Sequence, residues 1–144
     1  MRHISAAERA GTAGKTGSQF TGQVFNYLTM PATDGIVINT VTFNPGARTF
    51  WHSHTDGQIL EVLAGRGLVQ SEGGPVVSLG AGDTVWVPPG ERHWHGAAPD
   101  SFMIHTAISL GPTQWDHEVT DSEYTSRPDD SPRSDPSLNE TDER

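Results

Sequence analysis

Two short segments of the chain hold most of its histidines in spacings that suit a metal ion. Five of the seven histidines lie between residues 52 and 105, and two of these, His52 and His54, are two residues apart. Residues two apart on a strand point to the same face, so both imidazoles project side by side if this segment is extended. Gln58 follows after a turn-prone stretch and offers an amide oxygen, and His93 comes from the second segment. Together these residues could place three nitrogens and one oxygen around one divalent metal ion.

The chemistry of such a donor set follows from its charge. Imidazole suits several first-row metals, and the absence of cysteine excludes a thiolate site. Three neutral imidazoles and a neutral amide leave the charge of a divalent ion uncompensated, so the ion would be a strong Lewis acid that favours anionic ligands such as an alkoxide or cyanide. At least one coordination position would remain for substrate or water, which is typical of a catalytic site. Two alternatives stay open: Gln58 does not coordinate, or the histidines are ordinary surface or core residues.

Glycine and proline frame both histidine segments in a regular way. The first segment consists of Gly46, five residues, His52-x-His54, three residues, Gln58, six residues and Gly65, and the second of Gly82, five residues, Pro88-x-Gly90, two residues and His93. These two patterns resemble the two sequence motifs of the cupin family. The chain departs from the usual pattern at two positions, because Gln58 stands where a glutamate is expected and Ala97 replaces a frequent asparagine.

A narrower resemblance rests on the amino-acid sequence of three stretches. Residues 54–58, 89–99 and 115–121 are similar to the small bacterial manganese-dependent cupin hydroxynitrile lyases, and the likeness extends from about Phe20 to Tyr124. This resemblance implies that one divalent ion, preferably manganese and next iron, is held by His52, His54, Gln58 and His93. Zinc, nickel and cobalt are not excluded, since all of these metals tolerate nitrogen and oxygen ligands.

Two further histidines lie outside this ligand set. His95 is two residues beyond His93 and would share its face on a strand. His105 lies in an apolar stretch, where a histidine is more often a core residue with satisfied hydrogen bonds. The resemblance implies instead that both are catalytic pocket residues, and an imidazole that titrates near neutrality is a natural proton shuttle.

The segments around these residues read as short strands separated by turns. Runs rich in β-branched and aromatic residues alternate with Gly, Pro and Asp-Gly turns, and no window of helical period competes apart from a possible turn within 113–124. The expected strands cover residues 24–30, 36–43, 48–54, 58–63, 68–70, 75–79, 84–87, 93–95 and 101–110. Many short strands indicate an all-β sandwich or barrel. With the two motifs, the resemblance implies a cupin double-stranded β-helix, that is, a jelly-roll barrel.

The inward positions of these strands are expected to be apolar. The candidates are Phe50, Leu60, Val62, Val85, Val87, Met103 and Ile104. A shift of strand phase by one residue would exchange the two faces. The tryptophans at 51, 86 and 94 are expected to pack the sandwich more than to line a pocket.

Composition divides the chain into three parts. Residues 1–18 are rich in Gly, Ala, Ser and Thr and are expected to form a flexible arm, and residues 19–124 form the barrel. Residues 125–144 contain one large apolar residue, Leu138, and three prolines, so this acidic tail cannot bury enough surface to offset its ordering entropy and is expected to be disordered.

Charge and hydropathy limit the partners and the location. The net charge is −9, from 18 acidic and 9 basic residues, and no basic face for nucleic acid is expected. No apolar run approaches the roughly 18 residues of a membrane span, and the first residues lack the apolar stretch of a secretory signal. We therefore expect a cytoplasmic protein that acts on a small-molecule substrate. The resemblance further implies a homodimer or homotetramer.

Three classes of function are compatible with these residues. The first is a metal-dependent carbon–carbon lyase acting on a cyanohydrin or related carbonyl adduct, with His95 or His105 as the base. The second is a cupin dioxygenase that uses Fe(II) at the same ligands. The third is a cupin that binds a small ligand without turning it over. The resemblance favours the lyase.

Overall fold

The computed structural model describes residues 1–9, 14–15 and 17–126. It contains twelve strands and two short helices within these residues. They are α1 (Ala6–Arg9), β1 (Gly14–Lys15), β2 (Phe20–Thr21), β3 (Val24–Thr33), β4 (Ile36–Phe43), β5 (Arg48–Thr49), β6 (His52–His54), β7 (Gln58–Ser71), β8 (Val77–Gly80), β9 (Thr84–Val87), β10 (His93–Ala97), β11 (Met103–Leu110), β12 (Thr113–Trp115) and α2 (Asp121–Thr125). The expected all-β class is confirmed.

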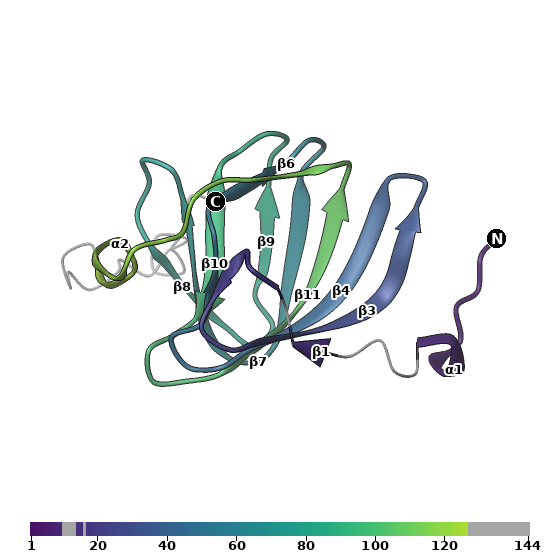
Figure 1. The fold of residues 1–144 in the computed structure, drawn as a ribbon, viewed down its shortest axis with the longest axis horizontal. Helices are drawn as coiled ribbons and strands as arrows, with labels where there is room; N and C mark the ends of the chain where they lie inside the picture. Colours follow the sequence, from purple (N-terminus) through teal and green to yellow (C-terminus); the bar gives the residue numbers. More distant parts are fainter. Residues whose placement is uncertain (10–13, 16, 127–144) are drawn as a thin grey trace, which may run out of the picture.

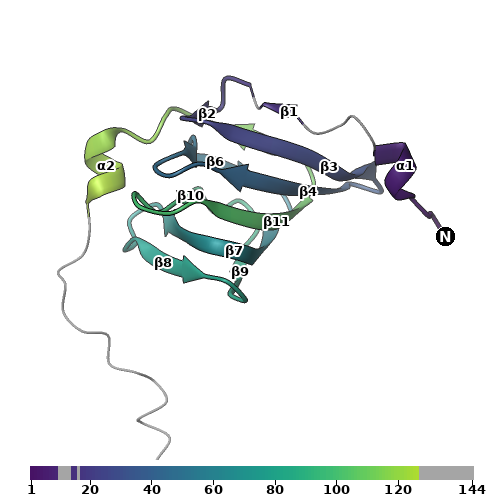
Figure 2. The same cartoon turned by 90° about the horizontal axis from the view of Figure 1, so that it is seen from below.

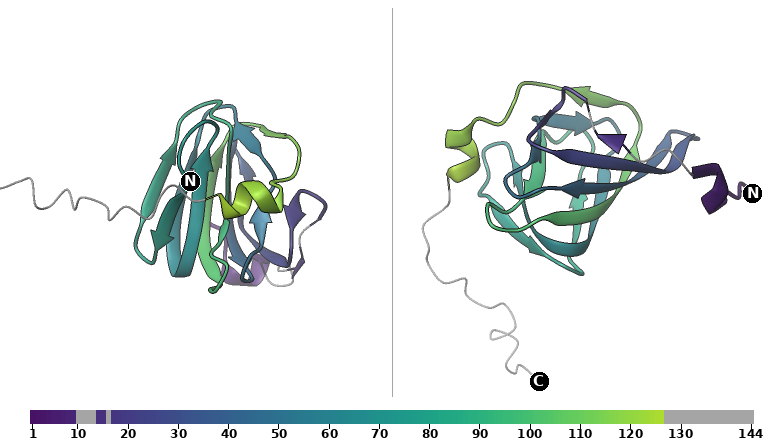
Figure 3. Two further views of the ribbon diagram at one scale, coloured as in Figure 1. Left: turned by 90° about the vertical axis from the view of Figure 1, so that its left-hand side faces the viewer. Right: turned by 60° about the horizontal axis from the view of Figure 1, so that its bottom comes forward.

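The strands form a barrel whose sheet runs in the order β1-β3-β4-β11-β7-β10-β5-β2. Figure 1 shows the barrel from the side, and the right-hand view of Figure 3 shows the strands curving around its interior. The helices α1 and α2 lie at opposite ends of the longest axis (Figure 2). The paired strands are antiparallel, and most neighbours, such as β4 and β11 or β7 and β10, are far apart in sequence, as expected for the Greek-key connections of a jelly roll.

The long strand β7 connects the two faces of the barrel. Its first half, from Gln58, pairs with β11 and β9, and its second half, from Arg66, pairs with β10 and β8. The pairing of β7 with β11 shifts by one residue, because Ile104 is opposite Ala64 while His105 is opposite Val62. Such a bulge bends the strand, and here it leaves Leu63 exposed on the outside.

Two apolar clusters fill the structure. The first lies inside the barrel and consists of Val24, Val41, Phe43, Ala47, Val62, Val69, Leu79, Ala97 and Met103. The second packs beneath α2 and consists of Trp51, Leu68, Val76, Trp94, Val119 and Tyr124. Two of the three tryptophans named above therefore pack the sandwich as expected, whereas Trp86 is 54% exposed.

Most of the expected inward residues are buried. Leu60, Val62, Val87 and Met103 are almost fully enclosed. Ile104 was a wrong candidate, because burial alternates along the first half of β11 and Met103 and His105 take the buried face. This is the effect of a one-residue phase difference on a strand.

The ends of the chain differ in how much of them is described. Within the expected arm, α1 forms one turn and β1 pairs with β3, while residues 10–13 and 16 lie outside the described residues. Thr125, the first residue of the expected tail, is the last residue of α2. Residues 127–144 are outside the described part, so the disorder of the tail and the flexibility of the arm stay predictions. Among the described residues, no helix has the length and apolar character needed to cross a membrane.

Candidate metal centre

Three strands bring the predicted ligand residues together. β6 carries His52 and His54, β10 begins at His93, and the antiparallel pairing of these strands places His93 directly opposite His52. Gln58 is the first residue of β7. It follows Gly57, whose φ is +101° and where a Cβ atom would lie 2.8 Å from the carbonyl oxygen of Val87. Only glycine fits this close approach, so Gly57 allows the chain to turn and present Gln58 to the histidines.

The four side chains are buried and their rings are close. The ring centroids of His52 and His93 are 4.3 Å apart, those of His52 and His54 5.0 Å, and those of His54 and His93 5.7 Å. None of the four is more than 4% exposed. The structure therefore brings all of the sequence-predicted ligand residues into one cluster.

The Nδ1 atom of each of these histidines has a fixed partner. His52 Nδ1 donates to the carbonyl oxygen of Phe50 at 2.8 Å, and His93 Nδ1 donates to that of Glu91 at 3.0 Å. His54 Nδ1 lies 3.0 Å from the hydroxyl oxygen of Thr113. A carbonyl oxygen can only accept, so the proton of a neutral His52 or His93 is on Nδ1 and Nε2 carries a lone pair. A carbonyl partner of this kind is common behind histidines that bind a metal.

The Nε2 atoms provide the test of whether a metal fits. His54 Nε2 has no hydrogen-bond partner among the described residues although it is buried. His93 Nε2 lies 2.9 Å from Gln58 Oε1, and Gln58 holds this orientation by donating from Nε2 to Ser109 Oγ at 3.1 Å. With the proton of His93 on Nδ1, two lone pairs face each other across this distance. A cation close to both atoms removes their repulsion, so the donor set fits a divalent metal.

Burial keeps these imidazoles neutral. Desolvation is the main cause that lowers the pKa of His52 well below 6.5 and that of His54 to about 4, and the nearby His93 is the second cause for both. Burial also lowers the pKa of His93. Metal ions bind the deprotonated imidazole, so the cluster is in its binding form at neutral pH.

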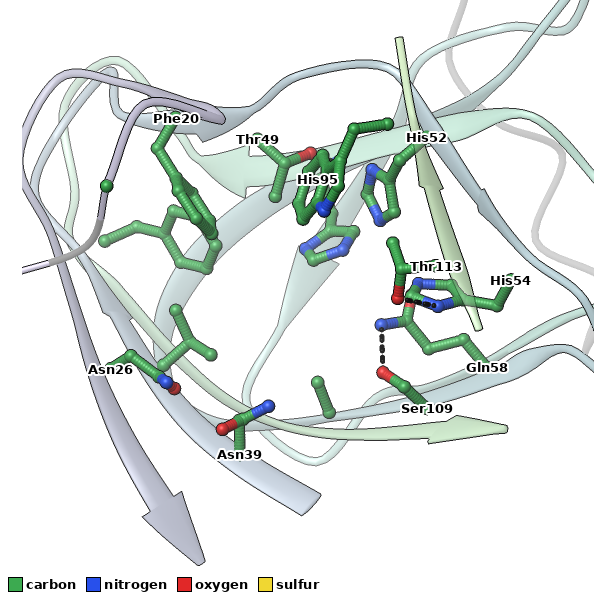
Figure 4. Close-up of a pocket in the computed structure, with 15 residues that line it drawn as sticks. Phe20, Asn26, Asn39, Thr49, His52, His54, Gln58, His95, Ser109 and Thr113 are labelled. Carbon is green, nitrogen blue, oxygen red and sulfur yellow. Dashed lines mark hydrogen bonds between the residues drawn. The ribbon is translucent and has the colours of Figure 1, made fainter. Parts of the chain in front are cut away.

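His95 is a fourth histidine at the edge of this cluster. One ligand atom from each of His52, His93 and His95 lies within 4.8 Å of the other two, and these three buried histidines could hold a metal ion. Figure 4 shows His95 and His54 on different sides of His52. The centre could therefore be completed by His54 with Gln58, as the sequence predicts, or by His95.

His105 lies behind His95. His105 Nε2 is 2.9 Å from His95 Nδ1, and both residues are buried. Burial lowers the pKa of His105 to about 4, and burial together with His105 lowers the pKa of His95 well below 6.5. His95 Nε2 has no partner among the described residues. His95 lines the adjoining cavity and His105 does not, so only the former is placed to touch a substrate.

A cavity of about 390 Å³ opens beside the histidines. This volume is within the usual range for small-molecule sites. Its lining consists of Gly17, Phe20, Asn26, Asn39, Val41, Phe43, Thr49, His52, His54, Gln58, His95, Ala107, Ser109, Thr113 and Trp115. Figure 4 shows the labelled side chains around the cavity. The lining combines aromatic and aliphatic surface with several uncharged polar groups.

Sequence reasoning did not identify five of the polar lining residues. They are Asn26, Asn39, Thr49, Ser109 and Thr113. The available signal was a carboxamide inside an apolar run, since Asn26 within 24–30 and Asn39 within 36–43 are unusual in such strands. The other three lie on strands whose neighbours depend on the tertiary fold.

Comparisons with known proteins agree with this architecture. The cupin domain family matches residues 39–105. An (R)-mandelonitrile lyase from Granulicella tundricola is 52% identical over 89 residues, which are 59% of this chain and 68% of that protein. A cupin-like protein from Thermotoga maritima, known from a crystal structure, is 41% identical with a TM-score of 0.74, over 84% of this chain and 95% of that one.

A more distant structure supports the fold alone. A DMSP lyase from Ruegeria pomeroyi has a TM-score of 0.59 at 20% identity, over 80% of this chain and 70% of that one. The two motifs, the barrel and the nearer relatives together lead to one conclusion: the chain belongs to the cupin family.

Proposed function

We propose that this protein is a metal-dependent lyase that cleaves cyanohydrins into a carbonyl compound and hydrogen cyanide. One observation carries the proposal: His95, with its unpartnered Nε2, lines the same cavity as an uncharged cluster that could hold a metal ion. The similarity to an (R)-mandelonitrile lyase supports the same reaction class.

The proposed ligands are His52, His54, Gln58 and His93. Their support is the Nε2 lone pair of His52 and of His93, the buried and unpartnered Nε2 of His54, and the orientation of Gln58 Oε1 by Ser109. All four groups are neutral, so the protein leaves the charge of a bound divalent ion uncompensated. Such an ion, manganese by preference and iron next, supplies Lewis acidity that stabilises negative charge developing on the substrate oxygen.

His95 is the proposed base. When its proton is on Nδ1, shared with His105, Nε2 offers a lone pair to the cavity. The hydroxyl proton of the cyanohydrin passes to Nε2 while the carbon–oxygen double bond forms. The bond to the nitrile carbon breaks and its electron pair leaves with cyanide. Cyanide then takes the proton from Nε2, which releases hydrogen cyanide and restores neutral His95.

His105 has a positioning role in this proposal. It lies 2.9 Å from His95 Nδ1 and does not line the cavity, so it acts on the substrate only through His95. It would hold the ring of His95 in place and select the tautomer that leaves Nε2 unprotonated.

The test of the reaction is cleavage of mandelonitrile by manganese-loaded protein, with the release of benzaldehyde as the measured signal. We expect equal rates in air and under anaerobic conditions. His95→Ala should keep its metal and lose roughly 10²–10⁴-fold in rate, because a positioned base commonly contributes that much. His3→Ala changes an exposed histidine far from the cluster in sequence and serves as the matched control.

Two outcomes would contradict the proposal. Absence of any cyanohydrin cleavage by the metal-loaded protein would exclude the lyase and favour a ligand-binding role. Oxygen uptake during turnover would move the assignment to an Fe(II) dioxygenase. Elemental analysis tests the ligands separately, since full metal content in the His52→Ala/His93→Ala double variant would refute the site.

A further inference from the structure

Two asparagines in the cavity take no part in the proposed reaction. The Oδ1 atoms of Asn26 and Asn39 are buried, and neither has a hydrogen-bond partner among the described residues. Both residues line the same cavity as His95. Asn26 is on β3 and Asn39 on β4, and Asn26 is opposite Val41, two residues from Asn39. Residues two apart share a face, so the two carboxamides lie on one wall.

A buried oxygen without a partner destabilises a fold, because it loses its hydrogen bonds to water and gains none in return. Two such oxygens on adjacent strands are therefore an unfavourable choice for packing alone. The wall around them is otherwise apolar, with Val41, Phe43 and Ala107. Aliphatic side chains would fill the same positions without this cost, which indicates that the carboxamides serve a ligand.

The position of the two asparagines separates them from the histidines. Figure 4 shows them on the wall away from His52, with Ser109 between Asn39 and Gln58. The amide nitrogen of Gln58 donates to Ser109, so these two residues bond to each other. The asparagines therefore form a second, separate polar region of the cavity. A molecule whose reacting carbon lies at His95 would reach them with its opposite end.

The remaining lining defines what that molecule must be. None of the described lining residues is Asp, Glu, Lys or Arg, so an ionised group at this wall would have no charged partner. Phe20, Phe43 and Trp115 offer aromatic surface to the same cavity. A hydroxyl group both donates and accepts a hydrogen bond, and it therefore matches either end of a carboxamide.

We propose that Asn26 and Asn39 form a subsite for a hydroxyl group of the substrate remote from the reacting carbon. The substrate class is then a hydroxylated aromatic cyanohydrin and the matching hydroxyaldehyde. This inference rests on the proposed lyase function for the placement of the reacting carbon, but the subsite is defined by its own contacts.

The test compares paired ligands by isothermal titration of the metal-loaded protein. The probes are benzaldehyde and its 3-hydroxy and 4-hydroxy derivatives. One added hydrogen bond corresponds to about two- to tenfold in affinity, so we expect at least one hydroxylated ring to bind several-fold more tightly than benzaldehyde. Asn26→Leu and Asn39→Leu should each reduce this preference while binding of benzaldehyde itself persists. Asn44→Leu is the control, because Asn44 lies outside the cavity and bonds to Gln23.

Thermal unfolding distinguishes a ligand role from a structural one. Removal of an unpaired buried oxygen should raise the Tm of Asn39→Leu by a few degrees, whereas loss of a structural contact would lower it. Asn39→Ala provides a smaller side chain if the leucine does not fit. A lowered Tm in both Asn39 variants would overturn the ligand role.

The binding and activity results separate the two proposals. Equal affinity for all three rings in the unaltered protein, or no binding of any of them, would overturn the subsite. A preference that persists in the Asn26→Leu/Asn39→Leu double variant would do the same. A hydroxyl preference without cyanohydrin cleavage would uphold the subsite and refute the lyase, and cleavage without a preference would do the reverse.

Discussion

The proton positions of two central histidines are set by carbonyl groups only two residues back along the chain. His52 donates to Phe50 and His93 donates to Glu91. Both acceptors are backbone carbonyls in the segments that lead into β6 and β10, so each histidine meets its partner within its own segment. Each of these two predicted ligands is therefore close in sequence to the group that holds its tautomer.

The neutral side chain of Gln58 can be tested by replacing it with a carboxylate. Gln58→Glu should keep its metal or hold it more tightly, because a carboxylate offsets part of the charge of the ion. The same charge weakens stabilisation of the developing anion, so turnover should fall by at least about tenfold, equivalent to about 1.4 kcal/mol. Elemental analysis and steady-state rates measure the two effects, with the exposed Gln114→Glu as the control. Loss of metal in step with rate would contradict this account.

The buried histidines also predict how the metal-free protein responds to acid. His54 has an ordinary pKa of 6.5 and a folded value of about 4, so the unfolded chain binds more protons between these two values. The free energy of unfolding should therefore be highest above pH 6.5 and fall as the pH decreases towards 4. His54 alone accounts for roughly 3 kcal/mol of this loss, at about 1.4 kcal/mol per pKa unit.

Urea unfolding of the metal-free protein at pH 7.5, 6 and 5 measures this loss. His54→Gln should show a shallower dependence on pH, since it removes one of the groups that must take up a proton. Stability that stays constant over this range would show that the histidines titrate normally in the folded protein.

At the scale of elements, the bend of β7 depends on a glycine that has no room for a side chain. Gly65 has a φ of +75°, and a Cβ atom there would lie 1.9 Å from the carbonyl oxygen of Phe102. Gly73 has almost the same φ, +76°, but nothing within 4 Å of its Cβ position. The two glycines share a backbone conformation and differ mainly in the room available for a Cβ atom, so they form a matched pair.

We expect Gly73→Ala to cost about 1 kcal/mol of unfolding free energy, which is the usual penalty for a left-handed backbone conformation. Gly65→Ala carries the same penalty and must also displace backbone, so it should cost at least about 2 kcal/mol more. Urea denaturation of both variants measures the difference. Equal costs would show that the backbone between β7 and β11 moves freely.

The helix α2 links the barrel to the end of the described chain. Tyr124 donates its hydroxyl to the carbonyl oxygen of Ala97 at 2.7 Å, and Arg48 bonds to Val119 and Asp121. Arg48 also lies over the ring of Tyr124, 4.4 Å from its centroid. These contacts show why the ordered domain extends to α2 rather than ending with the last strand.

At the scale of the whole molecule, the acidic tail should be dispensable. Residues 127–144 have one large apolar side chain, Leu138, so they can contribute little burial. A chain ending at Ser126 should keep its metal content and its Tm within about 4 °C, a change that corresponds to about 1 kcal/mol for a domain of this size. A larger decrease would mean that the tail binds to the barrel.

The assembly of the protein stays a prediction. Leu63, Val77 and Trp86 are exposed apolar residues on β7, β8 and β9. Exposed apolar surface of this kind suits an isologous contact between two copies. We expect light scattering at micromolar concentration to give the mass of a dimer or tetramer, and Trp86→Glu to weaken the assembly. A monomer mass for the unaltered protein would contradict the prediction.

The sequence by itself predicted the class of fold and the four side chains that cluster at the candidate metal centre. His52, His54, Gln58 and His93 lie within two motifs whose turns and two-residue spacing are local, so their faces follow from the chain around them. The resemblance of these two segments to the two cupin motifs then predicted that they lie together in the fold. The same local reasoning placed the apolar residues Leu60, Val62 and Val87 in the interior.

Only the tertiary structure decided the rest of the cavity. His105 lies behind His95 because β11 pairs with β7 across a bulge, and Asn26 and Asn39 share a wall because β3 pairs with β4. A register shift of one residue reverses the face of every side chain on a strand. Long-range pairing sets that register, so a single sequence predicts the clustered histidines and Gln58 but not the other residues that line the cavity.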